Sequence, residues 1–382
     1  MAAEATRSGS MAKAPRTSPS VRQLTTALKE RNRGAEGAVL KAAAATGLAG
    51  LGSHLDCLKA ALQSAVTLEF ATLPPYLSAL WSIKNEQDPV AKSIREVAHE
   101  EMLHMALAAN MLSAIGGSPQ INQTVPEYPG PLPGGVHAGL IAKLSCLTRD
   151  ALKDFMWIER PVGKLPPEEV HPFDQPAAHW DNVAGFEADE TIGEFYDAID
   201  AAFVRLQPDI RPDHQVTGPL AWMVVTSVGD VTRAIQLIKD QGEGSATSPK
   251  ASREELSHFY RFLEMYEGRK LIWDPAKQDF VRGDELPFPD VWPMAVVPKG
   301  GYPAAAVPTE VAQLLEQSDV AYSRMLDLLQ DCWRRGGQAS FVHAIEAMFE
   351  LQKSSRALMQ IPIPGGGGAT YGPCFRYRPS SS

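Results

Sequence analysis

Two copies of the motif Glu-x-x-His constrain this chain more than any other feature. The first copy runs from Glu101 to His104, in VAHEEMLHMALAANML, and the second from Glu255 to His258, in REELSHFYRFLEMYEG. Residues three apart lie on the same face of an α-helix, so each copy would place a carboxylate beside an imidazole. Two such helices, each complemented by one more glutamate from a further helix, make a dinuclear site in certain four-helix bundles. The doubled motif therefore predicts a helical bundle with a buried metal site.

Apolar residues recur at helical spacing through most of the chain, and no alternating strand pattern is sustained. The fold class is therefore mainly α. Pro74 and Pro75 interrupt the first long helical pattern, which predicts either a kinked helix or two helices joined end to end. Proline-rich stretches between the helices predict long loops, and residues 273–308 should be irregular or form short strands. The predicted helices span about 21–45, 54–84, 89–115, 148–158, 190–206, 228–244, 252–268, 309–335 and 339–359.

Two further glutamates complete a candidate ligand set. Glu69 lies on an apolar stripe with Val66 and Leu73, and Glu194 lies on a small-residue face with Ala198. A buried carboxylate must be paired, protonated or bound to metal, because burying a bare charge is very costly. Glu243, in the turn QGEG, is an alternative to Glu194 as the fourth carboxylate. The predicted metal ligands are Glu69, Glu101, His104, Glu194, Glu255 and His258.

The chemistry of this set favours a particular kind of metal. One Glu-x-x-His is normally a solvated pair on a helix surface, so the hypothesis depends on the motif being doubled. Four carboxylates and two neutral imidazoles would balance the charge of two divalent ions. Oxygen-rich ligation with two imidazoles suits iron or manganese better than a structural zinc. We therefore expect two iron ions, with manganese as the alternative, and we expect Glu100 to lie outside the ligand set.

Composition excludes several other classes of protein. The net charge is −9 with a pI near 5.5, which argues against nucleic acid as a partner. The four cysteines are far apart in sequence and form no metal-binding pair, which favours a reducing compartment, and we expect a cytoplasmic protein. The apolar run at about residues 42–51 is too short to cross a membrane. The basic, serine-rich start of the chain fits either a transit peptide or a disordered segment.

Three segments follow from these patterns. Residues 1–50 are expected to form a partly disordered N-terminal extension. Residues 51–272 hold every candidate ligand and should form the metal-binding bundle. Residues 273–382 should form a loop and two helices that pack on the bundle.

Several blocks of the sequence also resemble a known family. LEFATLPPYLSALWSIK, VAHEEMLHMALAANMLSAIGG, TIGEFYDAI, QGEG and ELSHFYRF are similar to the ferritin-like domain of the iminophenylpyruvate dimer synthases of violacein- and rebeccamycin-type pathways. That domain also occurs in stand-alone bacterial proteins. The resemblance covers roughly residues 54–270 and implies a ferritin-like four-helix bundle, with additional helices and long proline-rich loops, holding the six ligands named above. The synthases are much longer, so their dimer-forming activity is not implied.

Two classes of function remain open at this point. The first is a non-haem di-iron oxidase or oxygenase that uses O₂ on a small organic, amino-acid-derived substrate in secondary metabolism. The second is a metal-binding or peroxide-handling protein without an organic substrate, and a purely structural bundle is a third possibility. A substrate-sized pocket that reaches the metals would favour the first. The expected partners are the substrate and O₂, with no membrane or nucleic acid, and a homo-oligomer stays open.

Overall fold

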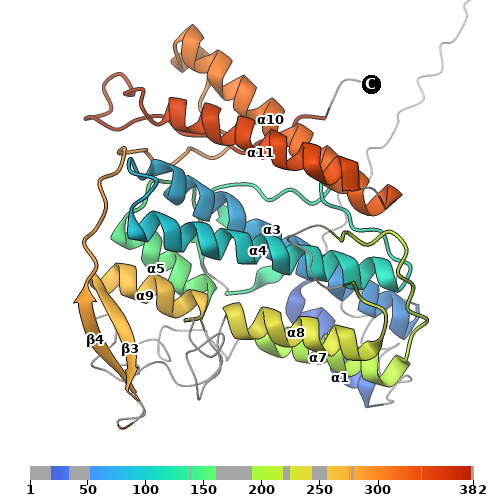
Figure 1. Ribbon diagram of the computed structural model, residues 1–382. Helices are drawn as coiled ribbons and strands as arrows, with labels where there is room; N and C mark the ends of the chain where they lie inside the picture. The colour runs from blue at the N-terminus through green and yellow to red at the C-terminus, as the bar shows by residue number, and fades with distance from the viewer. Residues whose placement is uncertain are drawn as a thin grey trace, which may run out of the picture.

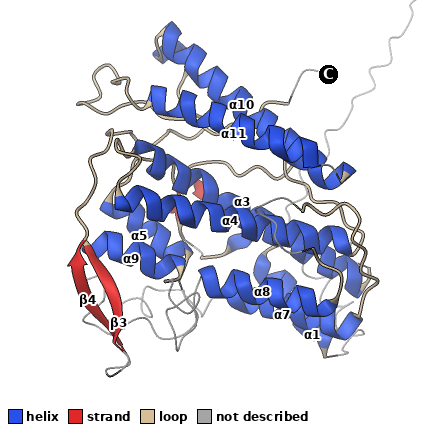
Figure 2. Ribbon diagram, in the orientation of Figure 1, coloured by secondary structure: helices blue, strands red, loops and turns tan. Residues whose placement is uncertain are grey.

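The computed structural model describes residues 19–33, 52–137, 139–160, 192–217, 224–242, 256–274, 276, 279–336 and 338–379. Within these residues the chain is mainly helical, with two short antiparallel strand pairs (Figure 2). The predicted fold class is confirmed. No helix in the described part of the chain is both long enough and apolar enough to span a bilayer.

A central helical hairpin organises the fold. Its helices are α3 (His54–Ser82) and α4 (Pro89–Ala114), which run through the middle of the molecule (Figure 1). Ser53 and Asp56 form a capping box at the start of α3, and Asp88 caps α4 immediately before Pro89. Each cap satisfies backbone N–H groups that have no partner within the helix. Both helices therefore begin where the sequence predicts.

The two prolines do not divide α3, which continues through both as one helix. Proline lacks the N–H that would bond the carbonyl four residues earlier. For Pro75 that carbonyl belongs to Ala71, and the hydroxyl of Tyr128 donates to it at 2.7 Å. A side chain from the loop after α4 thus replaces the missing helical hydrogen bond. The sequence left a kink and a junction of two helices as alternatives, and the structure excludes the junction.

This replacement bond leads to a testable prediction. Changing Tyr128 to phenylalanine should lower the free energy of unfolding by about 1–3 kcal/mol, because the buried carbonyl of Ala71 loses its donor. In a Pro75→Ala background residue 75 regains an N–H for that carbonyl, so the same change should cost less. Chemical denaturation of the four proteins of this double-mutant cycle measures the difference. Equal costs in both backgrounds would contradict the assigned role of Tyr128.

Shorter helices form a layer beneath the hairpin (Figure 1). Helices α5 (Arg149–Ile158) and α9 (His258–Glu267) contact each other under one half of it. Helices α1 (Val21–Asn32), α7 (Ile192–Leu206) and α8 (Val228–Gly242) pack together under the other half. Helix α9 begins later than predicted, because its N-cap is Ser257 and not Ser252. The two halves of this layer meet beneath the middle of α3 and α4, near the candidate ligands.

The C-terminal part of the chain covers the opposite face of the hairpin. Helices α10 (Thr309–Arg335) and α11 (Gln338–Leu358) pair with each other and lie over α3 and α4 (Figure 1). The fully buried carboxylate of Asp319 on α10 accepts hydrogen bonds from Arg376 and Arg378, which fastens the C-terminal tail. The remaining elements are β1 (Gly130–Pro131), η1 (Pro133–Gly135), β2 (Ile141–Ala142), β3 (Arg269–Asp274), β4 (Asp279–Glu285) and η3 (Ala304–Ala306). The expected segment boundary at 272/273 falls inside strand β3, and β4 is the short strand expected within 273–308.

Candidate metal centre

Five buried side chains from four helices converge between the central hairpin and the layer beneath it. They form two overlapping groups of possible metal ligands that share one carboxylate, and within each group the ligand atoms lie within 4.8 Å of one another. Each of the five side chains belongs to a residue that is at most 6% exposed. The first group is Glu69, Glu101 and His104, and the second is Glu101, Glu159 and His258. The shared Glu101 stands where a bridging carboxylate would.

Each imidazole turns its Nδ1 atom toward these carboxylates. Nδ1 of His104 lies 3.7 Å from Glu69 Oε2 and 3.6 Å from Glu101 Oε1. Nδ1 of His258 lies 2.8 Å from the same Oε1 atom of Glu101 and 3.6 Å from Glu159 Oε2. The two rings stack with centroids 5.5 Å apart. Glu69 and Glu159 therefore occupy equivalent positions on either side of Glu101.

The Nε2 atom of each imidazole, which faces away from the cluster, also has a hydrogen-bond partner. Nε2 of His258 lies 2.7 Å from Glu100 Oε2, and Nε2 of His104 lies 2.9 Å from Gln241 Oε1 on α8. Glu100 also accepts from Arg261 at 3.1 Å. An ionised carboxylate only accepts hydrogen bonds, so Nε2 of His258 donates to Glu100, and Nδ1 is the nitrogen that faces the other carboxylates. Metal-binding histidines are commonly oriented in this way.

Hydroxyl groups fix the three carboxylates. Tyr196 on α7 donates to Glu69 Oε1 at 2.5 Å, and Tyr76 on α3 donates to Glu159 Oε1 at 2.6 Å. Thr72 donates to Glu101 Oε2 at 2.7 Å. Each carboxylate thus has one oxygen held by a hydroxyl, while the other oxygen faces an imidazole.

The electrostatics of the cluster call for positive charge. Burial raises the pKa of Glu69 and of Glu159, because an ionised carboxylate loses its hydration. Burial also opposes ionisation of Glu101, but the two neighbouring imidazoles outweigh it and hold the pKa of Glu101 well below its usual range. In turn, burial opposes charging of His104, yet the carboxylates of Glu101 and Glu69 raise its pKa to about 10. Without a metal, protons must supply the missing charge.

These features fit a pair of divalent metal ions. Although Nδ1 of His258 is close to Glu101, the geometry is not that of a hydrogen bond, and this buried nitrogen has no hydrogen-bond partner among the described residues. A buried polar atom without a partner is costly, and a metal ion in the cluster would satisfy it. Three carboxylates and two imidazoles form the kind of donor set that binds iron or manganese. The described residues therefore fit the expected cofactor.

A cavity reaches this cluster from beneath the central hairpin. It has a volume of about 390 Å³, including space open to solvent. The predicted ligands Glu69, Glu101 and His104 contribute to its wall, as does Glu159. Its remaining wall consists of Leu68, Thr72, Ile158, Ile192, Gly193, Tyr196, Ile238, Lys239 and Gly242. A small molecule in this space would contact the ligands directly.

The structure brings together four of the six predicted ligands, namely Glu69, Glu101, His104 and His258. It does not bring Glu194 to them. That side chain is 45% exposed and lies 3.8 Å from Lys29, because α7 buries its aromatic face and turns Glu194 outward. Glu255 and the alternative Glu243 lie outside the described residues.

Sequence reasoning missed Glu159, which follows the last residue of α5. The signal was present, since Glu159 comes four residues after the buried Phe155 and three after the buried Met156. Glu159 therefore continues the apolar face of its helix, by the same rule that identified Glu69. Glu100 contacts Nε2 of His258, the nitrogen that faces away from the ligand cluster, in agreement with the expectation that Glu100 lies outside the ligand set.

The position of Glu100 predicts a graded effect on metal binding. Glu100→Gln should weaken metal affinity by about 10–100-fold, as removal of partners behind a ligand commonly does. Glu96→Gln is a matched control, because Glu96 lies one turn earlier on α4 and reaches Arg261 only at 3.9 Å, with 68% of its side chain exposed. Competitive titration against a chelator measures both affinities. An unchanged affinity in Glu100→Gln would show that the carboxylate does not orient His258.

Comparison with known proteins agrees with this geometry. A family model described as ferritin-like matches residues 62–267, more than half of the 382-residue chain. A crystal structure of a ferritin-like protein from Caulobacter vibrioides is similar, with a TM-score of 0.55 and 22% sequence identity over 84% of this chain and 97% of that one. At this identity the likeness concerns the fold alone. A search of curated proteins gave no significant match. Since the family model covers all five converging ligands, the chain belongs to the ferritin-like family.

Proposed function

We propose that this protein is a non-haem dinuclear metal oxidase or oxygenase that binds two iron ions and uses O₂ to oxidise a small organic substrate. One observation supports this proposal above the others: the cavity of about 390 Å³ is lined by the metal-ligating side chains themselves. Such a space would let a small organic molecule contact the metal ligands, as the proposed oxidation requires.

The charge balance argues for one further ligand. Three carboxylates and two neutral imidazoles would leave a net charge of +1 around two Fe²⁺ ions. A fourth carboxylate would neutralise the site, and Glu255 precedes His258 by three residues in the sequence. Since Glu194 points away, Glu255 is our proposed sixth ligand. Glu69, Glu101, His104, Glu159 and His258 are the other five.

The protein's own groups would set the geometry and handle protons. Bound iron supplies the redox chemistry with O₂, which amino-acid side chains cannot supply. Tyr196 and Tyr76 each donate a hydrogen bond to a buried carboxylate oxygen, and they would keep Glu69 and Glu159 oriented as the charge of the site changes. Apolar residues such as Leu68 and Ile158 in the cavity wall would limit the entry of water.

The substrate class follows from the cavity and from the sequence resemblance. The space suits a molecule of modest size, and its wall includes Lys239, whose ammonium pairs with Asp197 at 2.5 Å. The domain that the sequence resembles belongs to synthases of amino-acid-derived indolic metabolites. We therefore propose an amino-acid-derived acid in secondary metabolism as the substrate.

Anaerobic loading followed by oxygen exposure tests this function. Protein purified without added metal is loaded with Fe²⁺ under argon, and iron per chain is measured by elemental analysis. Oxygen consumption is then followed with aromatic amino acids and their 2-oxo acids, and products are identified by mass spectrometry. We expect about two iron ions per chain and O₂ uptake that a substrate stimulates.

Two results would count against the proposal. Failure to bind iron or manganese would remove the basis for any oxidase. Binding of two ions with rapid consumption of peroxide, and with no product from any organic compound, would favour the alternative of a peroxide-handling protein. Glu194→Gln provides the control, since its carboxylate lies at the surface.

A further inference from the structure

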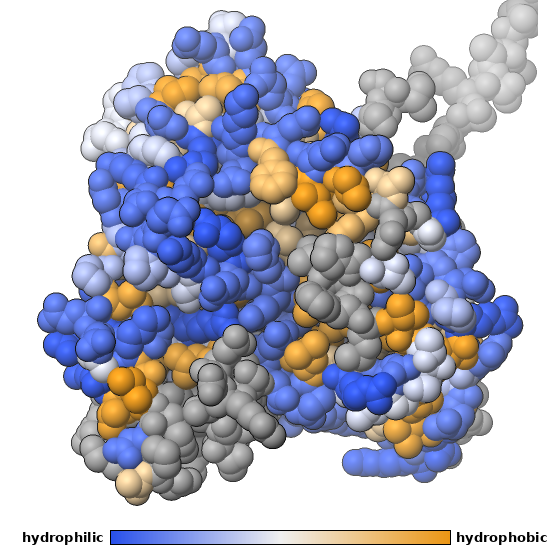
Figure 3. Space-filling model, in the orientation of Figure 1, coloured by the Kyte–Doolittle hydropathy of each residue, from blue (hydrophilic) through white to orange (hydrophobic). Residues whose placement is uncertain are grey.

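A second and larger cavity lies on the opposite side of the central hairpin from the metal centre. Its volume is about 710 Å³, including space open to solvent. Helices α3 and α4 form its floor, and α10 and α11 form its roof, with Phe375 of the C-terminal tail contributing to the wall. On the face seen in Figure 3, hydrophobic side chains gather where the α10–α11 hairpin meets the layer below.

The wall of this cavity is almost wholly apolar. Aromatic and aliphatic side chains such as Phe70 and Leu73 alternate with four methionines, and no charged side chain of the described residues lines it. The methionines are Met102, Met105, Met325 and Met348. Methionine is flexible and polarizable, so a wall rich in it can adapt to ligands of different shape.

Two polar groups accompany this wall. The indole N–H of Trp333 is already used, because it donates to Asn110 Oδ1 at 2.9 Å. The hydroxyl of Tyr322 is buried and has no hydrogen-bond partner among the described residues. The described residues therefore offer the cavity an apolar surface without a charged group.

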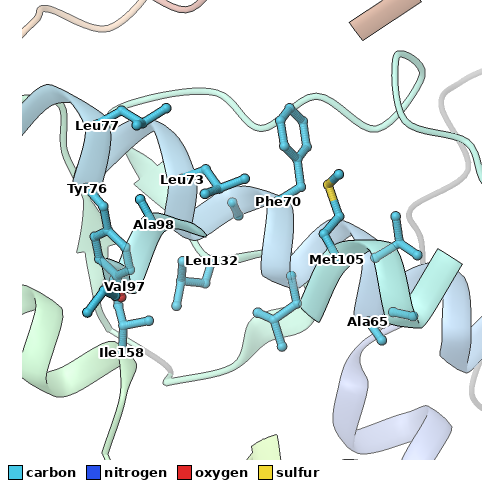
Figure 4. Close-up of a cluster of buried hydrophobic side chains, with 14 of the residues drawn as sticks. Ala65, Phe70, Leu73, Tyr76, Leu77, Val97, Ala98, Met105, Leu132 and Ile158 are labelled. Carbon is cyan, nitrogen blue, oxygen red and sulfur yellow. The ribbon is translucent and has the colours of Figure 1, made fainter. Parts of the chain in front are cut away.

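The cavity and the metal centre lie back to back on the same two helices. Glu69 and His104 belong to the ligand cluster, whereas the residues that directly follow them, Phe70 and Met105, line the apolar cavity. Figure 4 shows Phe70, Leu73 and Met105 on one side of the helices and Tyr76 with Ile158 on the other. The helical wall separates the two spaces, so the apolar cavity is distinct from the proposed substrate pocket.

The apolar side chains that line this space lack packing partners over part of their surface. Interiors are close-packed, and a void deprives its wall of dispersion contacts. Water would gain little there, because a buried water needs two to four polar partners. An apolar ligand would restore the missing contacts. The roof of α10 and α11 leaves a covered space, which suits a narrow chain better than a helix from another protein.

We propose that this cavity binds the hydrocarbon chain of a neutral single-chain lipid, such as a long-chain alcohol or ester. An acyl carboxylate is a poorer candidate, because the wall has no cation to pair with it and burying an unpaired charge is costly. This inference does not depend on the proposed oxidase activity, since the two sites share no lining residue.

Displacement of a fluorescent dye tests the inference on the full-length protein. Nile red should bind with saturable enhancement at about one dye per chain, and tetradecanol should displace it. We expect tetradecanoate to bind at least about tenfold more weakly than tetradecanol, because its carboxylate would be unpaired. Solvent extraction of the purified protein, followed by mass spectrometry, then shows whether a neutral lipid is carried along.

Three variants separate the cavity from the rest of the surface. Ala344→Leu fills the buried side of the cavity, and Met348→Trp narrows it from a half-buried position without overpacking the interior. Each should reduce dye and alcohol binding at least about tenfold, since the lost contacts are apolar. Phe349→Ser is the matched control on the same helix, because Phe349 is 61% exposed and lies outside the cavity. Its binding should equal that of the wild type.

Clear results would overturn the inference. Dye binding that Met348→Trp leaves unchanged, or that Phe349→Ser abolishes, would place the dye on the outer surface. Equal or tighter binding of tetradecanoate would contradict a neutral ligand. Absence of saturable binding to the wild type, together with a raised Tm of Ala344→Leu, would mark the cavity as a packing defect. Metal content measured on the same samples reports on the metal centre independently.

Discussion

Replacing Glu101 with glutamine should abolish the binding of both metal ions. Glu101 is the one carboxylate common to the two ligand groups, and its Oε1 atom faces both His104 and His258. A carboxamide carries no charge, and turning its nitrogen toward the imidazoles would remove an acceptor. We expect a fall in affinity of more than about 100-fold for each ion, beyond the 10–100-fold typical of residues behind a ligand. Elemental analysis after Fe²⁺ loading and desalting measures the result.

The structure of the variant needs a separate check. Glu101 also balances the charge of two buried imidazoles, so its loss should destabilise the metal-free protein by about 3–5 kcal/mol. Far-UV circular dichroism at low temperature shows whether the helices remain. Thr72→Val is a useful companion, because it leaves the Glu101 carboxylate and removes the hydroxyl that contacts Glu101 Oε2 and the backbone carbonyl of Glu69. Two firmly bound ions in a folded Glu101→Gln protein would refute the bridging role.

Local chemistry made most of the helices predictable. Asp88 followed by Pro89 marks the start of α4, and Thr148 marks the start of α5, because each side chain caps free N–H groups at that point. The predicted start of α9, at residue 252, was wrong because two residues could cap this helix. Ser252 and Ser257 both precede the apolar stripe, and the sequence alone does not decide which of them caps the helix.

The ligands on α3 and α4 could also be predicted, because each lies on the apolar stripe of its own long helix. Glu69, Glu101 and His104 are buried by the same packing that buries their apolar neighbours. Periodicity within one helix therefore suffices for these three residues. The second group is different, because it depends on the end of α5 meeting the start of α9. No local pattern encodes that meeting, because the two ends are far apart in the sequence and helices α7 and α8 lie between them.

The orientation of helix α7 explains why Glu194 lies outside the ligand cluster. Ala198 and Ala202 suggested that small residues mark the face that packs against a neighbour, which placed Glu194 on the inner side. The buried face also carries Phe195 and Ile199, and it is these larger side chains that set the orientation of the helix. Burying aromatic and aliphatic side chains removes far more apolar surface from water than burying alanines. The contribution of α7 to the centre is therefore Tyr196 and not Glu194.

The assignment of Glu159 in place of Glu194 can be decided by a matched pair of glutamine variants. Each variant removes one negative charge and leaves the side-chain volume almost unchanged. Glu159 is 5% exposed, hydrogen-bonded to Tyr76 and close to His258, whereas the side chain of Glu194 is 45% exposed and lies 3.8 Å from Lys29. If the buried residue is a ligand, only its variant should lose metal.

We expect Glu159→Gln to retain about one ion per chain and Glu194→Gln to retain both. The remaining ion should be the one held by Glu69 and His104, because the first group keeps all its members. Combining Glu159→Gln with His104→Ala should then remove the last ion, which locates it. Isothermal titration with Fe²⁺ under argon gives both the stoichiometry and the affinity. Loss of an ion from Glu194→Gln, with full binding in Glu159→Gln, would restore the assignment made from the sequence and contradict the arrangement described for α5 and α7.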